Sequence, residues 1–96
     1  MIYLDNAATT KVADSVVDAM LPYFKEYYGN ASSIYQLGAK SKEALDESRE
    51  YIAGTLGAKT NEIYFTAGGS ESDNWALKAT ADAYASKGKH IITTKI

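Results

Sequence analysis

The sequence predicts an α/β fold that contains one βαβ unit, and three observations in its second half predict it. A β-prone run covers residues 62–66, an alanine-rich helical stretch covers residues 70–87, and a second β-prone run covers residues 90–95. A strand, a helix and a strand within about 35 residues are typical of a right-handed crossover between parallel strands. Two parallel strands cannot cover their own faces and edges. We therefore expect their partner strands to lie beyond residue 96 or in another chain, so that this chain opens a larger protein.

The first twelve residues predict an extended arm. Ile2 and Leu4 alternate with Tyr3 and Asp5, and residues 6–10 are small, polar and without a helical period. Residues 13–96 then read as the beginning of a domain.

A helix is predicted over residues 13–28, before the βαβ unit. Its apolar side chains recur at steps of three and four residues, which places them on one face. Pro22 lies inside this stretch and has no backbone donor, so we expect a bend or an early end there. The face consists of Val16, Val17, Met20, Leu21, Phe24, Tyr27 and Tyr28.

A second helix is predicted over residues 35–56, with Gly57 as its stop. The small side chains of Ser41, Ala44 and Ser48 share its apolar face, which indicates close approach to a neighbouring segment. The opposite side is expected to face solvent and is formed by Lys42, Glu43, Asp46, Glu47, Arg49 and Glu50.

Composition limits the classes of function. With 46% hydrophobic and 23% charged residues the chain is typical of a soluble globular protein. Its net charge of −2 offers no positive field for nucleic acid. The absence of cysteine and the single histidine predict no disulfide and no thiolate or imidazole metal site. No signal peptide and no membrane span is evident, so we expect a cytoplasmic protein without membrane partners.

The turn from Gly68 to Ser70 is the main candidate site. It joins the predicted strand to the predicted helix, and its glycines allow a ligand to approach the backbone closely. The first amides of the helix have no partner inside it and, with the Ser70 hydroxyl, suit a phosphate group. A plainer interpretation makes Ser70 only the helix N-cap, with Asp73 completing a capping box. The turn matches neither a P-loop nor a dinucleotide fingerprint nor a nucleophile elbow.

Four ordered segments carry a family resemblance that covers essentially the whole chain: residues 3–10 (YLDNAATT), 29–33 (GNASS), 62–74 (EIYFTAGGSESDN) and 90–94 (HIITT). Together they closely resemble the N-terminal quarter of the pyridoxal-phosphate-dependent cysteine desulfurases, the NifS/IscS-like group of class V aminotransferases. The resemblance implies that residues 13–96 begin a three-layer large domain of the fold type I class. It also implies that Gly69, Ser70 and Glu71 bind the phosphate of pyridoxal 5'-phosphate, and that Asn6 and Ala7 lie on the substrate side.

Two positions depart from the family pattern. The family often shows Asn-Pro-Ser-Ser-x-His where this chain has Ala31 in place of the proline and Tyr35 in place of the histidine. Tyrosine cannot reproduce the titration of histidine near neutral pH.

The resemblance also implies a reaction. The parent enzyme would convert L-cysteine to L-alanine and pass sulfur to an enzyme cysteine as a persulfide, for iron–sulfur cluster assembly or other sulfur biosynthesis. The lysine that forms a Schiff base with the cofactor and the persulfide cysteine would lie outside residues 1–96, so the segment alone should be inactive. The family implies a homodimer and a possible sulfur acceptor protein.

Several alternatives stay open at this point. The segment could belong to another class V enzyme, an aminotransferase or a selenocysteine lyase, because these share the phosphate site. It could also be a small module for phosphorylated ligands, or an interaction scaffold. His90 and Trp75 are expected to be structural, with Trp75 in the core.

Overall fold

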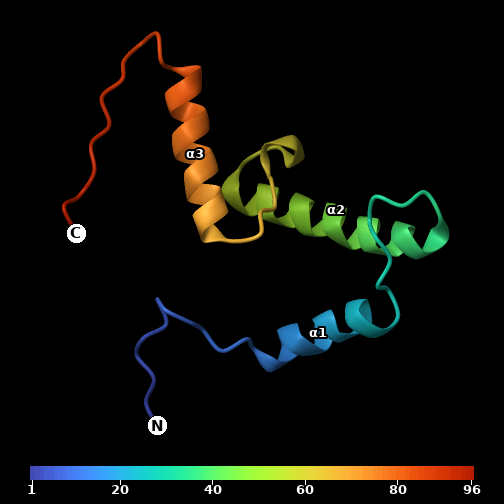
Figure 1. Ribbon diagram of the computed structural model, residues 1–96. Coiled ribbons are helices and arrows are strands. Elements are labelled where there is room, and N and C mark those ends of the chain that lie inside the picture. Colours follow the sequence, from blue (N-terminus) through green and yellow to red (C-terminus); the bar gives the residue numbers. More distant parts are fainter. The chain divides into compact units, whose positions relative to one another are not determined.

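The computed structural model describes residues 1–96 and consists of helices joined by irregular segments (Figure 1). In chain order the helices are α1 (Asp14–Lys25), α2 (Gln36–Leu56), the short 3-10 helix η1 (Thr60–Glu62) and α3 (Gly69–Ala83). The chain divides into two compact units, Met1–Ile63 and Tyr64–Ile96. The first unit holds α1, α2 and η1, and the second holds α3.

The two predicted strands do not form, so the predicted βαβ unit is not confirmed. The run at residues 62–66 consists of the last residue of η1 followed by irregular backbone, and residues 90–95 have no regular secondary structure. A strand is stabilised by hydrogen bonds to a neighbouring strand. No backbone hydrogen bond joins these two runs to each other or to any other segment as a ladder. Of the predicted unit only the helix is present.

The N-terminal arm is irregular, as predicted, but it is not extended throughout. The chain turns at residues 6–8, where the amide of Ala8 donates to the carbonyl of Asp5 at 3.0 Å. The Tyr3 hydroxyl lies 2.9 Å from that same carbonyl and 2.7 Å from the Thr9 hydroxyl. Side-chain hydrogen bonds therefore fold the arm back on itself.

Helix α1 begins close to its predicted start and ends three residues before its predicted end at residue 28. Pro22 lies inside the helix, which does not end at the proline but continues to Lys25. The amides of Glu26 and Tyr27 both donate to the Pro22 carbonyl, at 2.8 and 2.9 Å, which closes the last turn.

Helix α2 agrees with the predicted bounds to within one residue. Gly57 ends it in the left-handed conformation, with φ of 66°. The amide of Gly57 donates to the Gly54 carbonyl at 3.3 Å, and the amide of Ala58 donates to the Ala53 carbonyl at 2.9 Å. This pair of bonds is the Schellman arrangement, which needs a residue tolerant of positive φ.

The segment between α1 and α2 crosses the first turn of α2 at two glycines. A Cβ atom on Gly29 would overlap the carbonyl oxygen of Leu37, and one on Gly38 would overlap the carbonyl oxygen of Asn30. Gly38 is buried. The crossing is held by the Ser41 hydroxyl, which donates to the Tyr27 carbonyl at 2.8 Å. Ser41 thus makes the close approach that the small-residue face predicted.

Arg49 departs from its predicted role on a solvated face. Its Nε donates to the Ile63 carbonyl at 3.3 Å, and its guanidinium also pairs with Asp46 at 3.1 Å. A hydrogen bond from Lys42 lowers the pKa of Asp46 below its ordinary value, and the charge of Arg49 acts in the same direction. Arg49 therefore ties the middle of α2 to the residue that follows η1.

Helix α3 begins at Gly69 and ends at Ala83, four residues before its predicted end at residue 87. The chain continues in turns, in which the amides of Lys87 and Gly88 donate to the Tyr84 carbonyl at 2.8 and 3.3 Å. Trp75 was expected in a core, and that expectation is wrong for this chain, because 49% of the residue is exposed. Its ring meets the edge of the Tyr64 ring at a centroid distance of 5.2 Å.

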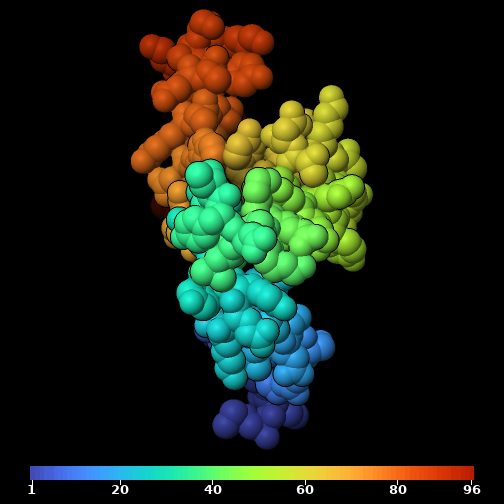
Figure 2. Space-filling model, turned by 90° about the vertical axis from the view of Figure 1, so that its right-hand side faces the viewer, coloured from blue at the N-terminus to red at the C-terminus, as the bar shows by residue number.

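The buried core is very small. Ala53, with 3% of its surface exposed, is the sole buried apolar side chain. Most large apolar side chains of α1 and α2 are exposed. Figure 2 shows the two helices in blue to green. No helix is both long enough and apolar enough to cross a lipid bilayer.

Candidate functional site

The candidate site is the turn that opens α3, residues 66–72. Gly68 is the N-cap residue, and no side chain caps the helix. The amides of Gly68, Gly69, Ser70 and Glu71 have no acceptor within the chain, whereas the amide of Ser72 donates to the Gly68 carbonyl at 3.2 Å. Free amides at a helix start carry the positive end of the helix dipole. The turn therefore presents a group of hydrogen-bond donors with positive character.

Ser70 lies in the first turn of α3 and is not its N-cap, so the plainer interpretation of Ser70 as a capping residue is wrong. No capping box with Asp73 forms. The Ser70 hydroxyl makes no hydrogen bond within the chain, while its carbonyl accepts one from the Asn74 side chain at 2.8 Å. The hydroxyl is thus available to a ligand, and the carbonyl is already occupied.

Glu71 contributes differently from Ser70. Its carboxylate accepts a hydrogen bond from the Ala67 amide at 2.7 Å, across the turn. The carboxylate repels an anion, so the group of Glu71 that can serve an anionic ligand is its backbone amide. The sequence did not indicate this internal bond.

The two glycines leave the turn open. A Cβ atom on Gly68 or Gly69 would meet no heavy atom within 4 Å. Gly68 has φ of 175°, an extended conformation that any residue adopts. The backbone therefore does not require glycine here, and the missing side chains instead leave the amides accessible to an oxyanion. Donors of this kind are the groups that suit a phosphate.

A pair of hydroxyl groups, which the sequence alone did not reveal, spans the turn. The Thr66 and Ser72 oxygens lie 2.6 Å apart, and the Thr66 hydroxyl also lies 3.1 Å from the Gly68 carbonyl. Thr66 is half-buried, whereas the residues from Gly68 to Ser72 are exposed. The sequence feature that could have indicated this contact is a hydroxyl residue on each side of the Gly68-Gly69 pair, Thr66 before it and Ser72 after it.

Asn6 and Ala7, predicted on the substrate side, belong to the unit Met1–Ile63, and the turn of α3 belongs to the unit Tyr64–Ile96. Both residues are exposed in the turn of the arm, where the Asn6 carbonyl accepts from the Thr10 hydroxyl at 3.0 Å. Of the predicted site residues, α3 brings together Gly69, Ser70 and Glu71.

The two positions that depart from the family pattern lie in the connection before α2. Tyr35 is the N-cap residue of α2 and makes no side-chain capping bond. Ala31 is half-buried in the turn that precedes it, where the Asn30 side chain accepts from the Ser32 amide at 2.9 Å.

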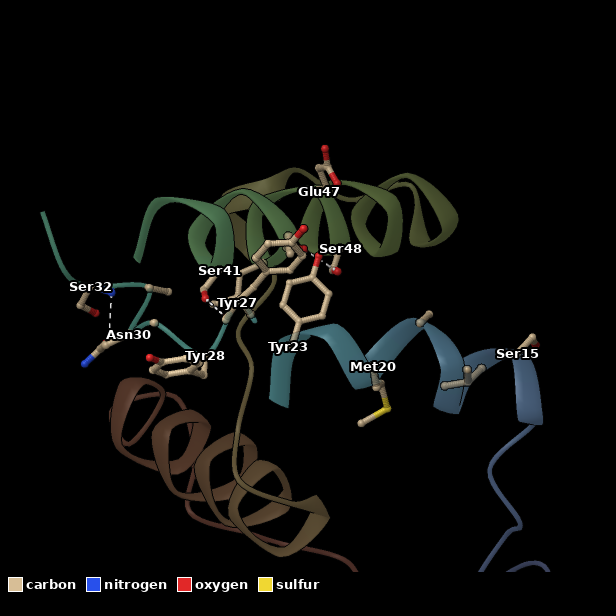
Figure 3. Close-up of a pocket in the computed structure, with 16 residues that line it drawn as sticks. Ser15, Met20, Tyr23, Tyr27, Tyr28, Asn30, Ser32, Ser41, Glu47 and Ser48 are labelled. Atoms are coloured by element: carbon tan, nitrogen blue, oxygen red, sulfur yellow. Dashed lines mark hydrogen bonds between the residues drawn. The ribbon is translucent and has the colours of Figure 1, made fainter. Parts of the chain in front are cut away.

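A groove of about 900 Å³ lies between α1 and α2 in the first unit (Figure 3). Tyr23 and Tyr27 project from the α1 side toward α2, and their rings meet edge to face at 5.8 Å. Ser41 and Ser48 line it from α2. The groove is largely apolar and open. No cluster of acidic, histidine or cysteine side chains in the chain could hold a metal ion.

The chain is similar to known proteins over nearly its whole length. The family model described as Aminotransferase class-V matches residues 2–96. The chain is 58% identical to "Cysteine desulfurase IscS" of Methanosarcina thermophila and 52% identical to proteins of the same name from Dictyoglomus turgidum and Clostridium botulinum, over 99% of this chain in each case. It spans 24% of the length of each of these relatives.

The fold is similar to that of a solved structure titled "NIFS-LIKE PROTEIN". The TM-score is 0.82 with 37% sequence identity, and the match covers 90% of this chain and 24% of that one. The fold of this chain therefore resembles part of the fold of that protein.

Proposed function

The chain belongs to the aminotransferase class-V family, and on this premise we propose that it is the amino-terminal segment of a pyridoxal-phosphate-dependent cysteine desulfurase. The complete enzyme would convert L-cysteine to L-alanine and pass the sulfur atom to one of its own cysteines as a persulfide. This chain has no cysteine, so the sulfur-accepting residue would lie outside residues 1–96. The names of the relatives favour this activity over that of another class V enzyme.

The observation that carries the proposal is the set of unpaired donors at the start of α3. The amides of Gly69, Ser70 and Glu71 and the Ser70 hydroxyl would hold the phosphate of pyridoxal 5'-phosphate. A phosphate carries acceptor oxygens and negative charge, which match donors with positive character. When bound, the cofactor supplies the electron sink for bond cleavage in the substrate.

The role of this chain's residues is binding and orientation. The turn would fix the phosphate end of the cofactor, which leaves the position of the ring to residues elsewhere in the enzyme. Asn6 and Ala7 would lie on the substrate side, as the family resemblance implies. We also propose a cytoplasmic homodimer that passes sulfur to an acceptor protein for iron–sulfur cluster assembly, an expectation supported by the resemblance and by the relatives' names.

The complete enzyme would also restore the strands. We propose that residues 62–66 and 90–95 pair with further strands of a fold type I large domain, so that α3 becomes the helix of a βαβ unit. The β-prone composition of both runs supports this proposal.

Substitution of Ser70 tests the phosphate site. In the full-length protein, Ser70→Ala should weaken binding of pyridoxal 5'-phosphate by roughly 10- to 100-fold, because a hydrogen bond to a charged group is lost. The measurement is titration of cofactor-free protein, with Ser86→Ala as the control, since Ser86 follows α3 and makes no side-chain hydrogen bond. Equal affinity in Ser70→Ala and the parent protein would contradict this site.

Product analysis tests the reaction. Release of alanine and sulfide from L-cysteine with a reductant supports a desulfurase. Amino-group transfer to a keto acid, or activity confined to selenocysteine, would identify one of the other class V enzymes. Tight phosphate binding by residues 1–96 alone would instead favour a small binding module.

A further inference from the structure

The turn of α3 contains a chain of hydrogen bonds with a defined direction. The Thr66 hydroxyl has one hydrogen, and it points to the Gly68 carbonyl at 3.1 Å. The hydroxyl of Ser72, 2.6 Å from Thr66, must then donate to the Thr66 oxygen. Hydrogen bonds therefore run from Ser72 to Thr66 and from Thr66 to Gly68. They join the first turn of α3 to the segment that precedes the two glycines and to the first glycine itself.

This chain of bonds leaves no free carbonyl at Gly68. The Gly68 carbonyl accepts from both the Thr66 hydroxyl and the Ser72 amide, so both of its lone pairs are used. An unpaired carbonyl in the turn would repel an anion. With that carbonyl occupied, the polar groups of Gly68 to Glu71 that lack an internal partner are backbone amides and the Ser70 hydroxyl.

The bonds also restrict a flexible piece of backbone. Two consecutive glycines have many accessible conformations, and ordering them on binding would weaken affinity for a ligand. A turn that is already fixed avoids much of that loss. Thr66 is suited to this task because it is half-buried and makes both contacts with a single oxygen atom.

We propose that Thr66 is a positioning residue, which acts with Ser72 to fix the Gly68-Gly69 backbone so that its amides face the phosphate of the cofactor. The inference rests on the proposed phosphate site and adds a role to residues that do not touch the phosphate. Thr66 orients the donors, and Ser72 orients Thr66.

The test compares two ligands in the full-length enzyme after removal of its cofactor: pyridoxal 5'-phosphate and pyridoxal, which lacks the phosphate. Thr66→Val removes the hydroxyl with little change in shape. It should weaken binding of the phosphorylated ligand by about tenfold, since two hydrogen bonds are lost, and leave pyridoxal binding unchanged. Thr66→Ser should restore the affinity to within about twofold because it keeps the hydroxyl.

Two further variants sharpen the result. Ser72→Ala removes only the donor to Thr66 and should have a smaller effect in the same direction, about two- to fivefold. Thr80→Val is the control, because Thr80 lies on the same helix and its side chain makes no hydrogen bond in the chain. Thermal unfolding of the cofactor-free proteins checks that each variant is folded.

The outcomes separate this inference from the proposed function. If Ser70→Ala weakens phosphate-dependent binding and Thr66→Val does not, the positioning role is wrong and the site stands. Equal loss of affinity for both ligands in Thr66→Val would also overturn the positioning role. If Thr66→Val does not fold, Ser72→Ala decides, and an unchanged ratio of the two affinities there overturns it. If the parent enzyme does not prefer the phosphorylated ligand, the proposed function itself fails.

Discussion

Neighbouring residues in the first turn of α3 have different tasks. Ser70 leaves its hydroxyl available to a ligand, whereas Glu71 turns its carboxylate back to the Ala67 amide. The sequence predicted both as cofactor-binding residues. It could not separate them, because the distinction depends on the path of the turn and not on residue type. The backbone amide of Glu71, rather than its side chain, remains a candidate contact.

Glycine is required where the loop after α1 crosses α2. Gly29→Ala or Gly38→Ala in the full-length protein should lower stability by about 1–3 kcal/mol, because a methyl group would be forced against a backbone carbonyl. Thermal unfolding measures the change.

Gly54→Ala is the matched control for that prediction. Gly54 lies in the same helix, and a Cβ atom there would meet nothing within 4 Å. This substitution should raise stability by about 0.5–1 kcal/mol, since alanine favours a helix over glycine. Destabilisation of the same size by Gly54→Ala and Gly38→Ala would argue against the crossing.

At the scale of elements, α1 and α2 meet mainly through the connection between them. Ser41 and Ser48 both line the groove from α2, and their hydroxyl groups have different partners. The Ser41 hydroxyl bonds to Tyr27 outside its helix, while the Ser48 hydroxyl bonds to Ala44 one turn earlier in α2. Only the first of these bonds joins α2 to another segment, the connection that follows α1.

Alanine substitutions of the two serines should therefore change stability in opposite directions. Ser41→Ala should lower stability by about 0.5–1.5 kcal/mol because the hydrogen bond between α2 and the connection before it is lost. Ser48→Ala should be neutral or stabilising by up to about 0.5 kcal/mol, since alanine is the better helix former. Chemical denaturation of the full-length protein measures both. A larger loss for Ser48→Ala than for Ser41→Ala would be inconsistent with the observed contact.

Local signals predicted the helices well and the strands poorly. Apolar periodicity and Gly57 located α1 and α2, because helices form from contacts within three or four residues along the chain. A strand is stabilised by a partner that can lie anywhere in a sequence. The run 62–66 therefore has a composition typical of a strand but does not form one here. The start of α3 was predicted for the same local reason, whereas the Thr66 and Ser72 bonds depend on three-dimensional geometry.

For the whole molecule, the small amount of buried apolar surface limits the stability of this chain. Ala53 alone cannot offset the conformational entropy of 96 residues. The exposed apolar side chains of α1, α2 and α3 would be covered in the proposed complete enzyme. Residues 62–66 and 90–95 would then gain backbone partners.

Hydrogen exchange can test this coverage. In the full-length enzyme, amides of residues 62–66 and 90–95 should exchange slowly, because ladder hydrogen bonds protect them. In a peptide limited to residues 1–96 the same amides should exchange rapidly. Rapid exchange of both runs in the full-length enzyme would show that they are not strands there.

The irregular backbone after Gly88 would affect how easily proteases cleave the chain during its synthesis. Lys87 and Lys89 flank Gly88 just before residues that no ladder restrains. A trypsin-like protease binds its target in extended form and cuts unrestrained, exposed segments first. A nascent chain would thus be open to cleavage after Lys89 until the rest of the domain has been made, and its survival would depend on how soon the remaining strands arrive.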